Sequence, residues 1–362
     1  MRSALIVAVL SVGACTSAPP APSASPIFGE VQQLFEARRS AIATRDLAAY
    51  ERTFDPTHAT FATCMREEFT LGFSEPAVPT RVDAFGSYYR VVVSTLGVYF
   101  RYFVRRDADG SLRLTEPQPN EVGDARSRTD GPIRVDYWAI DEDVSEGIAT
   151  AAHHAYDVAV AEAIGTPKAI FTVQLYPVRA FLSGAPCWLA GAVSGSDAAP
   201  VVSLPVYLLP MDQAFRIPTV PAYDVIVHEA LHWIQGQNVS GSNFTAPWWL
   251  SEGWPDRVAR IDRSGVVRTV LCAIGFPTRE QLSRHGLAVL DDTTTLDAEK
   301  QYAAANIMVE YLFTTYGPKR YWQLYDGVTR VADYDVLFRD VLGVDQATFY
   351  SEWLAWAKGK YC

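Results

Sequence analysis

The sequence predicts an α+β protein with two folded domains, and three observations support this fold class. Apolar residues recur at intervals of three and four over residues 28–54, which is typical of a helix, and strand-like stretches follow. A polar segment over residues 117–131 indicates a domain boundary. After it, strand-like stretches come first and helical stretches come last, which is the order of a second α+β domain. The two domains are expected to cover residues 28–125 and 132–362.

The first domain is predicted to contain a helix followed by curved antiparallel strands. Residues 88–104 are rich in Val, Tyr and Phe, which favour strands. The sequence Asp-Ala-Asp-Gly at residues 107–110 precedes a second strand-like stretch over residues 111–115, and this pattern indicates a hairpin. The arrangement resembles the cone-shaped SnoaL-like fold. We expect this domain to be a spacer or a module on the substrate side.

The second domain is predicted to begin with strands and to end with helices. Its sequence after Ala222 is mainly helical in pattern. The elements expected before that point are a strand at residues 133–140, a helix at residues 144–164 that ends at Gly165, and strands at residues 169–176 and 201–209.

The N-terminus resembles an export signal that ends in a lipid attachment site. Residues 1–14 combine one cation, Arg2, with an apolar run that is too short to span a bilayer. The sequence Val-Gly-Ala-Cys that ends at Cys15 resembles the bacterial lipobox, in which the cysteine becomes the lipidated first residue of the mature protein. We therefore expect Cys15 to anchor the protein to a membrane. The alternative is an ordinary signal that is cleaved near Ala18.

Residues 15–27 are expected to be a tether between the membrane and the folded body. They are rich in Ser, Ala and Pro, a composition that cannot bury a core. Thr16 stands where an aspartate would retain a lipoprotein at the inner membrane. The resemblance therefore implies a location in the cell envelope, at the outer membrane if the cell has one.

The composition argues against nucleic-acid binding and leaves the disulfide pattern open. The formal net charge is −10, whereas proteins that bind phosphates carry basic patches. Four cysteines remain beyond Cys15, and in an oxidising compartment they can form two disulfides in three alternative pairings. These cysteines are Cys64, Cys187, Cys272 and Cys362.

A short HExxH motif in a predicted helix indicates a metal site. His228 and His232 are four residues apart, so their imidazoles lie on one helical face and can share one metal ion. Glu229 lies beside them, where it can take a proton from a water molecule that the metal activates. On these residues alone, the alternative is a pair of hydrogen-bonded core histidines.

A carboxylate downstream completes a zinc ligand set. Glu252 follows His232 by 20 positions in the sequence Trp-Leu-Ser-Glu-Gly. Two imidazoles and one carboxylate are a usual ligand set for catalytic Zn²⁺, with the fourth position left for water. Ser251 is expected to cap a second helix that has Pro255 in its first turn. Asp256 follows Glu252 by four residues and is expected to share its helical face.

The two motifs together resemble the gluzincin metallopeptidases, which are thermolysin-like zinc enzymes. The resemblance is greatest to the peptidase-MA-like domains of exported bacterial proteins, and it extends from about residue 132 to the C-terminus. It implies a thermolysin-like zincin fold, in which mixed strands are followed by a mainly helical lobe. It also implies that His228, His232 and Glu252 hold Zn²⁺ and that Glu229 is the general base.

The same resemblance assigns roles to two further residues. Asp256 matches the aspartate that orients the first zinc-bound histidine, and its alternative is a solvated surface acid. Tyr302 matches the tyrosine that binds the oxyanion of the reaction, and its alternative is a packing residue. Trp248 or Trp249 is expected to line a substrate cleft. His153 and His154 are interpreted as surface or packing residues of the helix at residues 144–164.

The expected activity is zinc-dependent hydrolysis of peptide bonds in peptide or protein substrates. Gluzincin aminopeptidases carry a Gly-x-Met-x-Asn motif that holds the substrate amine, and the sequence shows no such motif, which favours an endopeptidase. A sheet edge at residues 201–209 or 189–193 is expected to pair with the extended substrate. The alternative is a non-catalytic binding or assembly lipoprotein that keeps a zinc-bearing peptidase fold. Glu229 argues against it, because a structural zinc needs no base.

Overall fold

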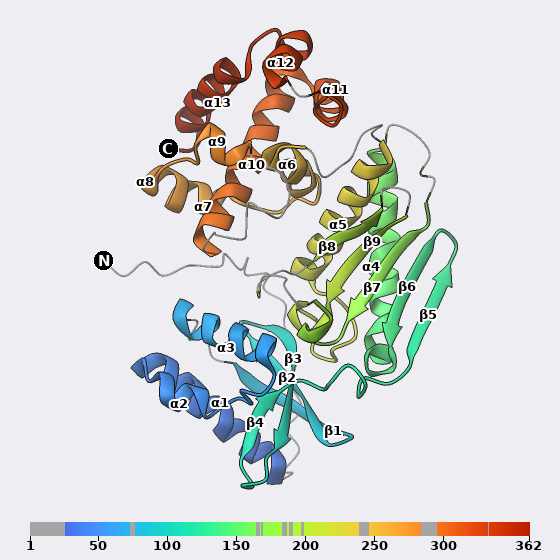
Figure 1. The fold of residues 1–362 in the computed structure, drawn as a ribbon, viewed down its shortest axis with the longest axis vertical. Coiled ribbons are helices and arrows are strands. Elements are labelled where there is room, and N and C mark those ends of the chain that lie inside the picture. Colours follow the sequence, from blue (N-terminus) through green and yellow to red (C-terminus); the bar gives the residue numbers. More distant parts are fainter. Residues whose placement is uncertain are drawn as a thin grey trace, which may run out of the picture.

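The computed structural model describes residues 26–72, 77–163, 167, 169–182, 187, 191–196, 199–238, 246–283, 295–331 and 333–362. They form an N-terminal domain, a second sheet with two long helices, and a helical lobe (Figure 1). The expected export signal, Cys15 and most of the expected tether lie outside the described residues. No helix among the described residues is both long enough and apolar enough to cross a membrane.

The N-terminal domain is an antiparallel sheet packed against helices. The strand order is β1-β2-β3-β4, and each strand is antiparallel to the next. A buried apolar cluster that includes Val31, Phe35, Val91 and Val104 joins the helices to the sheet. The elements are α1 (Pro26–Thr44), α2 (Leu47–Glu51), α3 (Ala59–Leu71), β1 (Val78–Phe85), β2 (Tyr88–Thr95), β3 (Val98–Arg106) and β4 (Leu112–Thr115).

The predicted helix and hairpin of this domain are present, but the structure divides the helix and the first strand further. The helical pattern over residues 28–54 belongs to α1 and α2, which separate at Arg45 because its φ of 56° is incompatible with a helix. The strand-like stretch over residues 88–104 is two strands, since Leu96 and Gly97 have φ of 51° and 86° and form a tight turn. The expected hairpin at residues 107–110 joins β3 to β4.

The second sheet is mixed and carries two helices on one face. Its strand order is β5-β6-β7-β9-β8; β6, β7 and β9 are parallel, and the two edge strands are antiparallel to their neighbours. Helix α4 packs on β6, α5 packs on β9 and β8, and the two helices pack against each other (Figure 1). The elements are β5 (Ala125–Asp130), β6 (Ile133–Trp138), α4 (Glu142–Ala161), β7 (Phe171–Tyr176), β8 (Ala192–Ser196), β9 (Ala199–Pro205) and α5 (Val220–Asn238).

The polar segment predicted as a domain boundary contains one of these strands. Residues 125–130 form β5, which pairs with β6 along its whole length. Five of its six residues are exposed, because an edge strand with solvent on both faces needs no apolar alternation. The sequence therefore lacks the pattern by which strands are recognised, and the boundary interpretation is wrong for residues 125–130.

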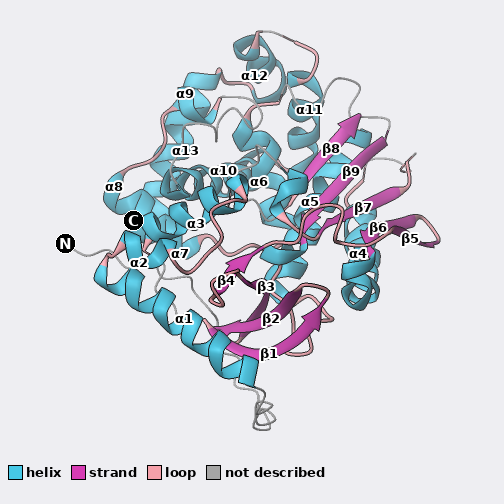
Figure 2. Ribbon diagram, turned by 60° about the horizontal axis from the view of Figure 1, so that its bottom comes forward, coloured by secondary structure: helices cyan, strands magenta, loops and turns pink. Residues whose placement is uncertain are grey.

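The C-terminal third is a helical lobe, in agreement with the predicted order of strands first and helices last (Figure 2). Its longest helix is α10, which packs along α6 at the side of the lobe that faces the second sheet. A π-helical turn at Val267–Leu271 connects α7 to α8. The helices are α6 (Trp248–Val258), α7 (Ser264–Val266), α8 (Cys272–Ile274), α9 (Arg279–Leu282), α10 (Thr295–Tyr316), α11 (Pro318–Val328), α12 (Tyr334–Leu342) and α13 (Gln346–Tyr361).

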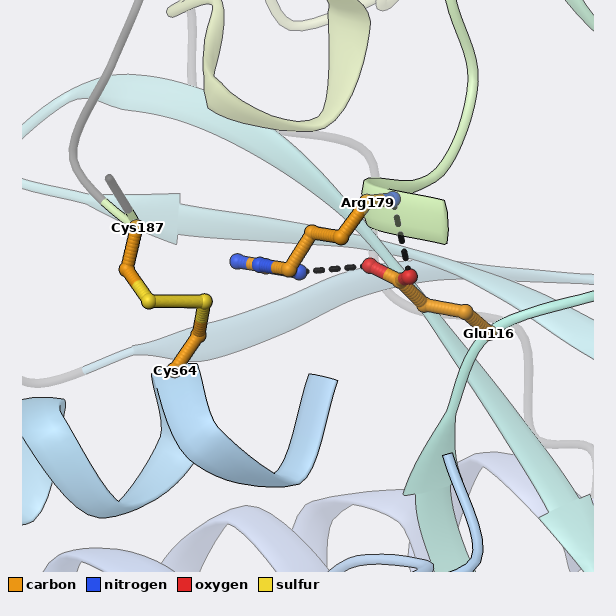
Figure 3. Close-up of a disulfide and its surroundings, with 4 residues drawn as sticks. All are labelled: Cys64, Glu116, Arg179 and Cys187. Atoms are coloured by element: carbon orange, nitrogen blue, oxygen red, sulfur yellow. Dashed lines mark hydrogen bonds and ion pairs between the residues drawn. A yellow bond between two sulfur atoms is a disulfide. The ribbon is translucent and has the colours of Figure 1, made fainter. Parts of the chain in front are cut away.

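Two disulfides fasten segments that are far apart in the sequence. Cys64 of α3 is bonded to Cys187, which precedes β8, so the N-terminal domain is tied to the second sheet (Figure 3). Beside this disulfide the Arg179 guanidinium donates to Glu116 over 2.6 Å. The second disulfide, Cys272–Cys362, holds the C-terminal end of the chain on α8. The structure thus selects one of the three pairings that the sequence leaves open.

A buried ion pair also joins the N-terminal domain to the second sheet. Arg101 of β3 lies 2.5 Å from Asp141, and both side chains are 0% exposed. Removal of either partner would leave an unpaired charge in the interior. The ion pair and the Cys64–Cys187 disulfide therefore hold the two sheets in one arrangement.

Candidate metal centre

The expected zinc ligands converge between α5 and α6. The Nε2 atoms of His228 and His232, which lie one turn apart on α5, are 3.0 Å from each other. The Oε2 atom of Glu252, on α6, is 3.2 Å from His228 Nε2 and 3.1 Å from His232 Nε2. Within the described part of the chain, this is the one group of His, Cys, Asp and Glu side chains that could hold a metal ion.

These separations fit a Zn²⁺ ion. Zinc–ligand bonds of about 2.0–2.1 Å at tetrahedral angles place neighbouring ligand atoms about 3.3 Å apart. The side chains of His228, His232 and Glu252 are 7%, 12% and 12% exposed, so the group is nearly buried but still reaches solvent. An open fourth position for water or substrate requires this partial access.

The charges around the ligands also favour a cation. Burial opposes a charge on His228, but the Asp256 and Glu252 carboxylates outweigh burial and raise its pKa to about 10. Burial likewise opposes ionisation of Glu252, yet the facing imidazoles lower its pKa to about 2. The site therefore stabilises positive charge between its carboxylates, as a site for Zn²⁺ must.

Asp256 lies behind the first histidine and is not a solvated surface acid. It is 0% exposed, and its Oδ1 lies 3.0 Å from His228 Nδ1. Arg263 neutralises it with two contacts, from Nε to Oδ2 over 2.8 Å and from Nη2 to Oδ1 over 3.3 Å. Arg263 also donates to Glu299 over 2.8 Å. Arg263 lies beyond the end of α6, where no sequence motif marks it as part of the site.

Helix α6 begins earlier than predicted. The helix starts at Trp248, with Pro247 at its N-cap, so Ser251 lies inside the helix and Pro255 lies in its third turn. Trp248, Trp249 and Leu250 are buried, and their packing extends the helix by a turn toward the N-terminus. The prediction that Ser251 caps this helix is therefore wrong, although Glu252 and Asp256 still share one face as expected.

Glu229 lies against the edge of the second sheet. Gly191, immediately before edge strand β8, comes so close that an added Cβ would lie 2.8 Å from Glu229 Cγ and 2.9 Å from its Oε1. Two segments are predicted from sequence to form a sheet edge. The prediction for residues 201–209 is wrong, because β9 lies between β7 and β8 and is not an edge strand. The other proposal, residues 189–193, overlaps β8, although residues 189 and 190 lie outside the described part.

Tyr302 of α10 also lies at the metal centre. Its ring centroid is 6.4 Å from that of His228 and 5.1 Å from that of Trp248. The Arg263 guanidinium carbon is 5.0 Å from the Tyr302 ring centroid, so one cation contacts both Asp256 and this tyrosine. Burial and the nearby carboxylates raise the pKa of Tyr302 well above its ordinary value, so the phenol keeps its proton.

The remaining candidates lie away from the centre. Trp249 stacks on Phe349 in the core of the helical lobe, so Trp248 is the tryptophan of this pair that reaches the site. His153 pairs with Asp130 over 2.9 Å on the surface of α4, and His154 packs near Tyr223. Neither histidine is among the converging ligands.

Comparison with solved structures finds zinc metallopeptidases. The chain is similar to an M1 zinc metallopeptidase from Deinococcus radiodurans, with a TM-score of 0.40 and 15% identity over 78% of this chain and 60% of that chain. It is also similar to leukotriene A4 hydrolase from Saccharomyces cerevisiae, with a TM-score of 0.38 and 15% identity over 80% of this chain and 45% of that chain. The chain thus spans less than two thirds of either structure. No family model and no curated protein matches it.

Proposed function

We propose that the chain is a zinc-dependent peptidase that cuts within peptide or protein chains. The observation that carries this proposal is the convergence of His228, His232 and Glu252. Glu229 lies beside them on α5 and contacts Gly191, which immediately precedes edge strand β8. A structural zinc normally has four protein ligands and no adjacent base. Three ligands that leave the fourth position open, with a base beside them, are the arrangement of a hydrolytic zinc site.

The zinc ligands, the base Glu229 and the phenol of Tyr302 would each have a separate role in the reaction. Zn²⁺ bound by the two imidazoles and the Glu252 carboxylate would polarise the substrate carbonyl and lower the pKa of a water molecule to about 7. Glu229 takes the proton of the attacking water and passes it to the leaving amine. Burial raises the pKa of Glu229, which makes it a stronger base than an exposed carboxylate. Tyr302, which keeps its proton, donates to the developing oxyanion.

The edge strand supports cleavage within a chain rather than at its N-terminus. An extended substrate can pair with β8 through its main chain, as peptides commonly do at sheet edges. The residues of β8 are Ala-Val-Ser-Gly-Ser, so this strand supplies no carboxylate for a substrate ammonium group. This strand therefore does not require the N-terminus of a substrate to lie at the metal, and it favours cleavage within a chain.

We further propose that the protein works in the cell envelope, anchored by a lipid on Cys15. The two disulfides support a compartment outside the reducing cytoplasm. The N-terminal domain, with its SnoaL-like resemblance, would act as the spacer or as a module on the substrate side. The tie between Cys64 and Cys187 supports the second role, because Cys187 is only four residues from Gly191.

A non-catalytic binding lipoprotein with a zinc-bearing fold is the competing function. The test incubates the full chain with a broad peptide library and reads the products by mass spectrometry, before zinc removal, after chelation and after zinc is restored. We expect internal cleavage that disappears with the metal and returns with it. An intact library in the presence of the zinc-loaded protein would favour the competing function.

Replacement of Tyr302 by Phe should lower kcat by about 10²-fold and leave KM and zinc content nearly unchanged. The reason is that the hydroxyl donates to charge that develops only in the transition state. Steady-state kinetics on a peptide identified in the library measure this effect. Tyr316→Phe, on the same helix but against Glu352, is the matched control and should retain full activity. Equal activity of the Tyr302 variant and the unmodified protein would contradict the oxyanion role.

Replacement of Gly191 by Ala should displace Glu229 and lower kcat by about 10²-fold, because small misplacement of a reacting group is costly. The new Cβ would meet Glu229 Cγ at 2.8 Å, closer than carbon atoms approach. Zinc content should not change, since Glu229 is not a ligand. Gly265→Ala, where an added Cβ meets nothing within 4 Å, serves as control. Full activity of the Gly191 variant would show that this contact does not position the base.

A further inference from the structure

Gln235 is a buried amide between α5 and α6. It follows His232 by three residues on α5 and is 0% exposed. Its Oε1 lies 2.8 Å from His232 Nδ1. Its Nε2 donates to the Ser251 carbonyl over 2.9 Å and to the Tyr321 hydroxyl over 2.8 Å. Both the oxygen and the nitrogen of the amide therefore have hydrogen-bond partners.

The Ser251 carbonyl decides which end of the amide faces the histidine. A carbonyl oxygen only accepts hydrogen bonds, so the Gln235 NH₂ group must face it and Oε1 must face His232. An amide oxygen also only accepts, so His232 Nδ1 must carry the proton. In a neutral imidazole the other nitrogen, Nε2, then keeps its lone pair. Nε2 is the atom that faces Glu252 and His228.

Pro255 explains why the Ser251 carbonyl is available. In an α-helix this carbonyl would accept the N–H of the residue four positions later, which here is Pro255 and has no N–H. The Gln235 amide fills the vacant place from the neighbouring helix. The proline in α6 thus leaves the Ser251 carbonyl free to accept from Gln235, and this hydrogen bond orients the Gln235 side chain on α5.

Tyr321 of α11 holds the amide from a third direction. Its hydroxyl accepts from Gln235 Nε2 and donates to the Leu250 carbonyl over 3.1 Å. Tyr321 is itself 0% exposed, so bulk solvent does not reach these bonds. A rotated amide would set its oxygen against the Ser251 carbonyl, and this repulsion restricts Gln235 to the orientation described above.

We infer that Gln235 is a positioning residue of the metal centre: it fixes the tautomer and orientation of His232 so that Nε2 is presented to zinc. The inference deepens the proposed function and rests on it, because it concerns the same zinc site. The two histidines are then held by different chemistry, His228 by the Asp256 carboxylate and His232 by a neutral amide. Such partners of zinc-bound histidines commonly contribute about 10- to 100-fold in metal affinity.

The test compares zinc affinity of the full chain with that of Gln235→Met and Gln235→Glu, by competition with a chromophoric chelator. Methionine has a similar volume but no acceptor, so Gln235→Met should bind zinc about 10- to 100-fold more weakly. Protonated glutamate offers a carbonyl oxygen to Nδ1 and a hydroxyl to the Ser251 carbonyl, and burial at this position favours the protonated form, so Gln235→Glu should recover most of the lost affinity. Gln237→Met, the same change two residues further along α5, should bind zinc like the unmodified chain. The visible spectrum of the Co²⁺-loaded forms reports ligand geometry independently of activity, and circular dichroism verifies folding.

The outcomes separate this inference from the proposed function. An altered Co²⁺ spectrum and weaker zinc binding in Gln235→Met, with recovery in Gln235→Glu, support the positioning role even if no peptide is cleaved. Unchanged affinity in Gln235→Met overturns it and leaves the peptidase proposal standing. Equal losses in the Met and Glu variants also overturn it, because the lost acceptor would not be the cause. Failure of the unmodified chain to bind zinc would overturn both claims.

Discussion

Replacement of Glu229 by Gln is expected to lower peptide turnover by about 10³-fold, within the range that general bases contribute. The amide has nearly the same shape as the carboxylate but cannot take a proton from water. Glu229 lies beside the histidines but is not one of the three converging ligands, so the variant should still bind zinc. Burial of this carboxyl and its contact with Gly191 leave little room for another base at its position. Initial rates and zinc content of the same preparation measure both parts of the expectation.

Glu146→Gln is the matched control, because Glu146 is an exposed glutamate on α4, which packs against α5. It should retain the activity of the unmodified chain. If Glu229→Gln cleaves peptides at a similar rate with zinc bound, Glu229 is not the base. If the variant loses zinc as well, its low activity would say nothing specific about proton transfer, and the role assigned here would lose its support.

Replacement of Gly253 by Ala is expected to destabilise the fold by about 3 kcal/mol, at the upper end of the usual cost of overpacking. An added Cβ at this position would lie 2.2 Å from the Ala305 carbonyl oxygen and 2.8 Å from Val309 Cγ2. The Ala305 clash is with backbone, so α6 and α10 would have to move apart. Because Glu252 is the adjacent residue, zinc affinity should fall with stability. Urea denaturation monitored by circular dichroism measures the change.

Gly359→Ala provides a control for which the expected change in stability has the opposite sign. Gly359 lies near the end of α13, is exposed, and an added Cβ meets nothing within 4 Å. Alanine should therefore stabilise this helix by up to about 1 kcal/mol. Equal stability of Gly253→Ala and the unmodified chain would contradict the close approach of α6 and α10.

The placement of the ligands on their helices follows from local rules, whereas the meeting of the two helices is implied by the resemblance to the gluzincin metallopeptidases. The i, i+4 spacing of His228 and His232 puts both on one helical face. The same rule puts Glu252 and Asp256 on one face of α6, even though the predicted start of that helix is wrong. The order of strands before helices also follows from pattern alone. The prediction of these features needs no knowledge of which helices pack together.

Apart from Asp256, the residues that support the ligands and Glu229 depend on tertiary contacts and are not predicted. Gln235 can be recognised as a positioning residue only from its hydrogen bond to the Ser251 carbonyl of another helix. Arg263 reaches Asp256 across the end of α6, and Gly191 meets Glu229 across the gap between strand and helix. No spacing rule joins such pairs, because they are brought together by packing. Strand β5 escapes prediction for the converse reason: its exposed faces carry no pattern.

The most direct test of the metal centre is the zinc content of the full chain and of His232→Ala, measured by plasma mass spectrometry after dialysis at limiting zinc. His153→Ala, which alters a surface histidine of α4, is the control. We expect about one zinc ion per chain in the unmodified protein and in His153→Ala, and little or none in His232→Ala. Absence of zinc from the unmodified protein, or equal zinc in His232→Ala, would contradict the assignment of the site.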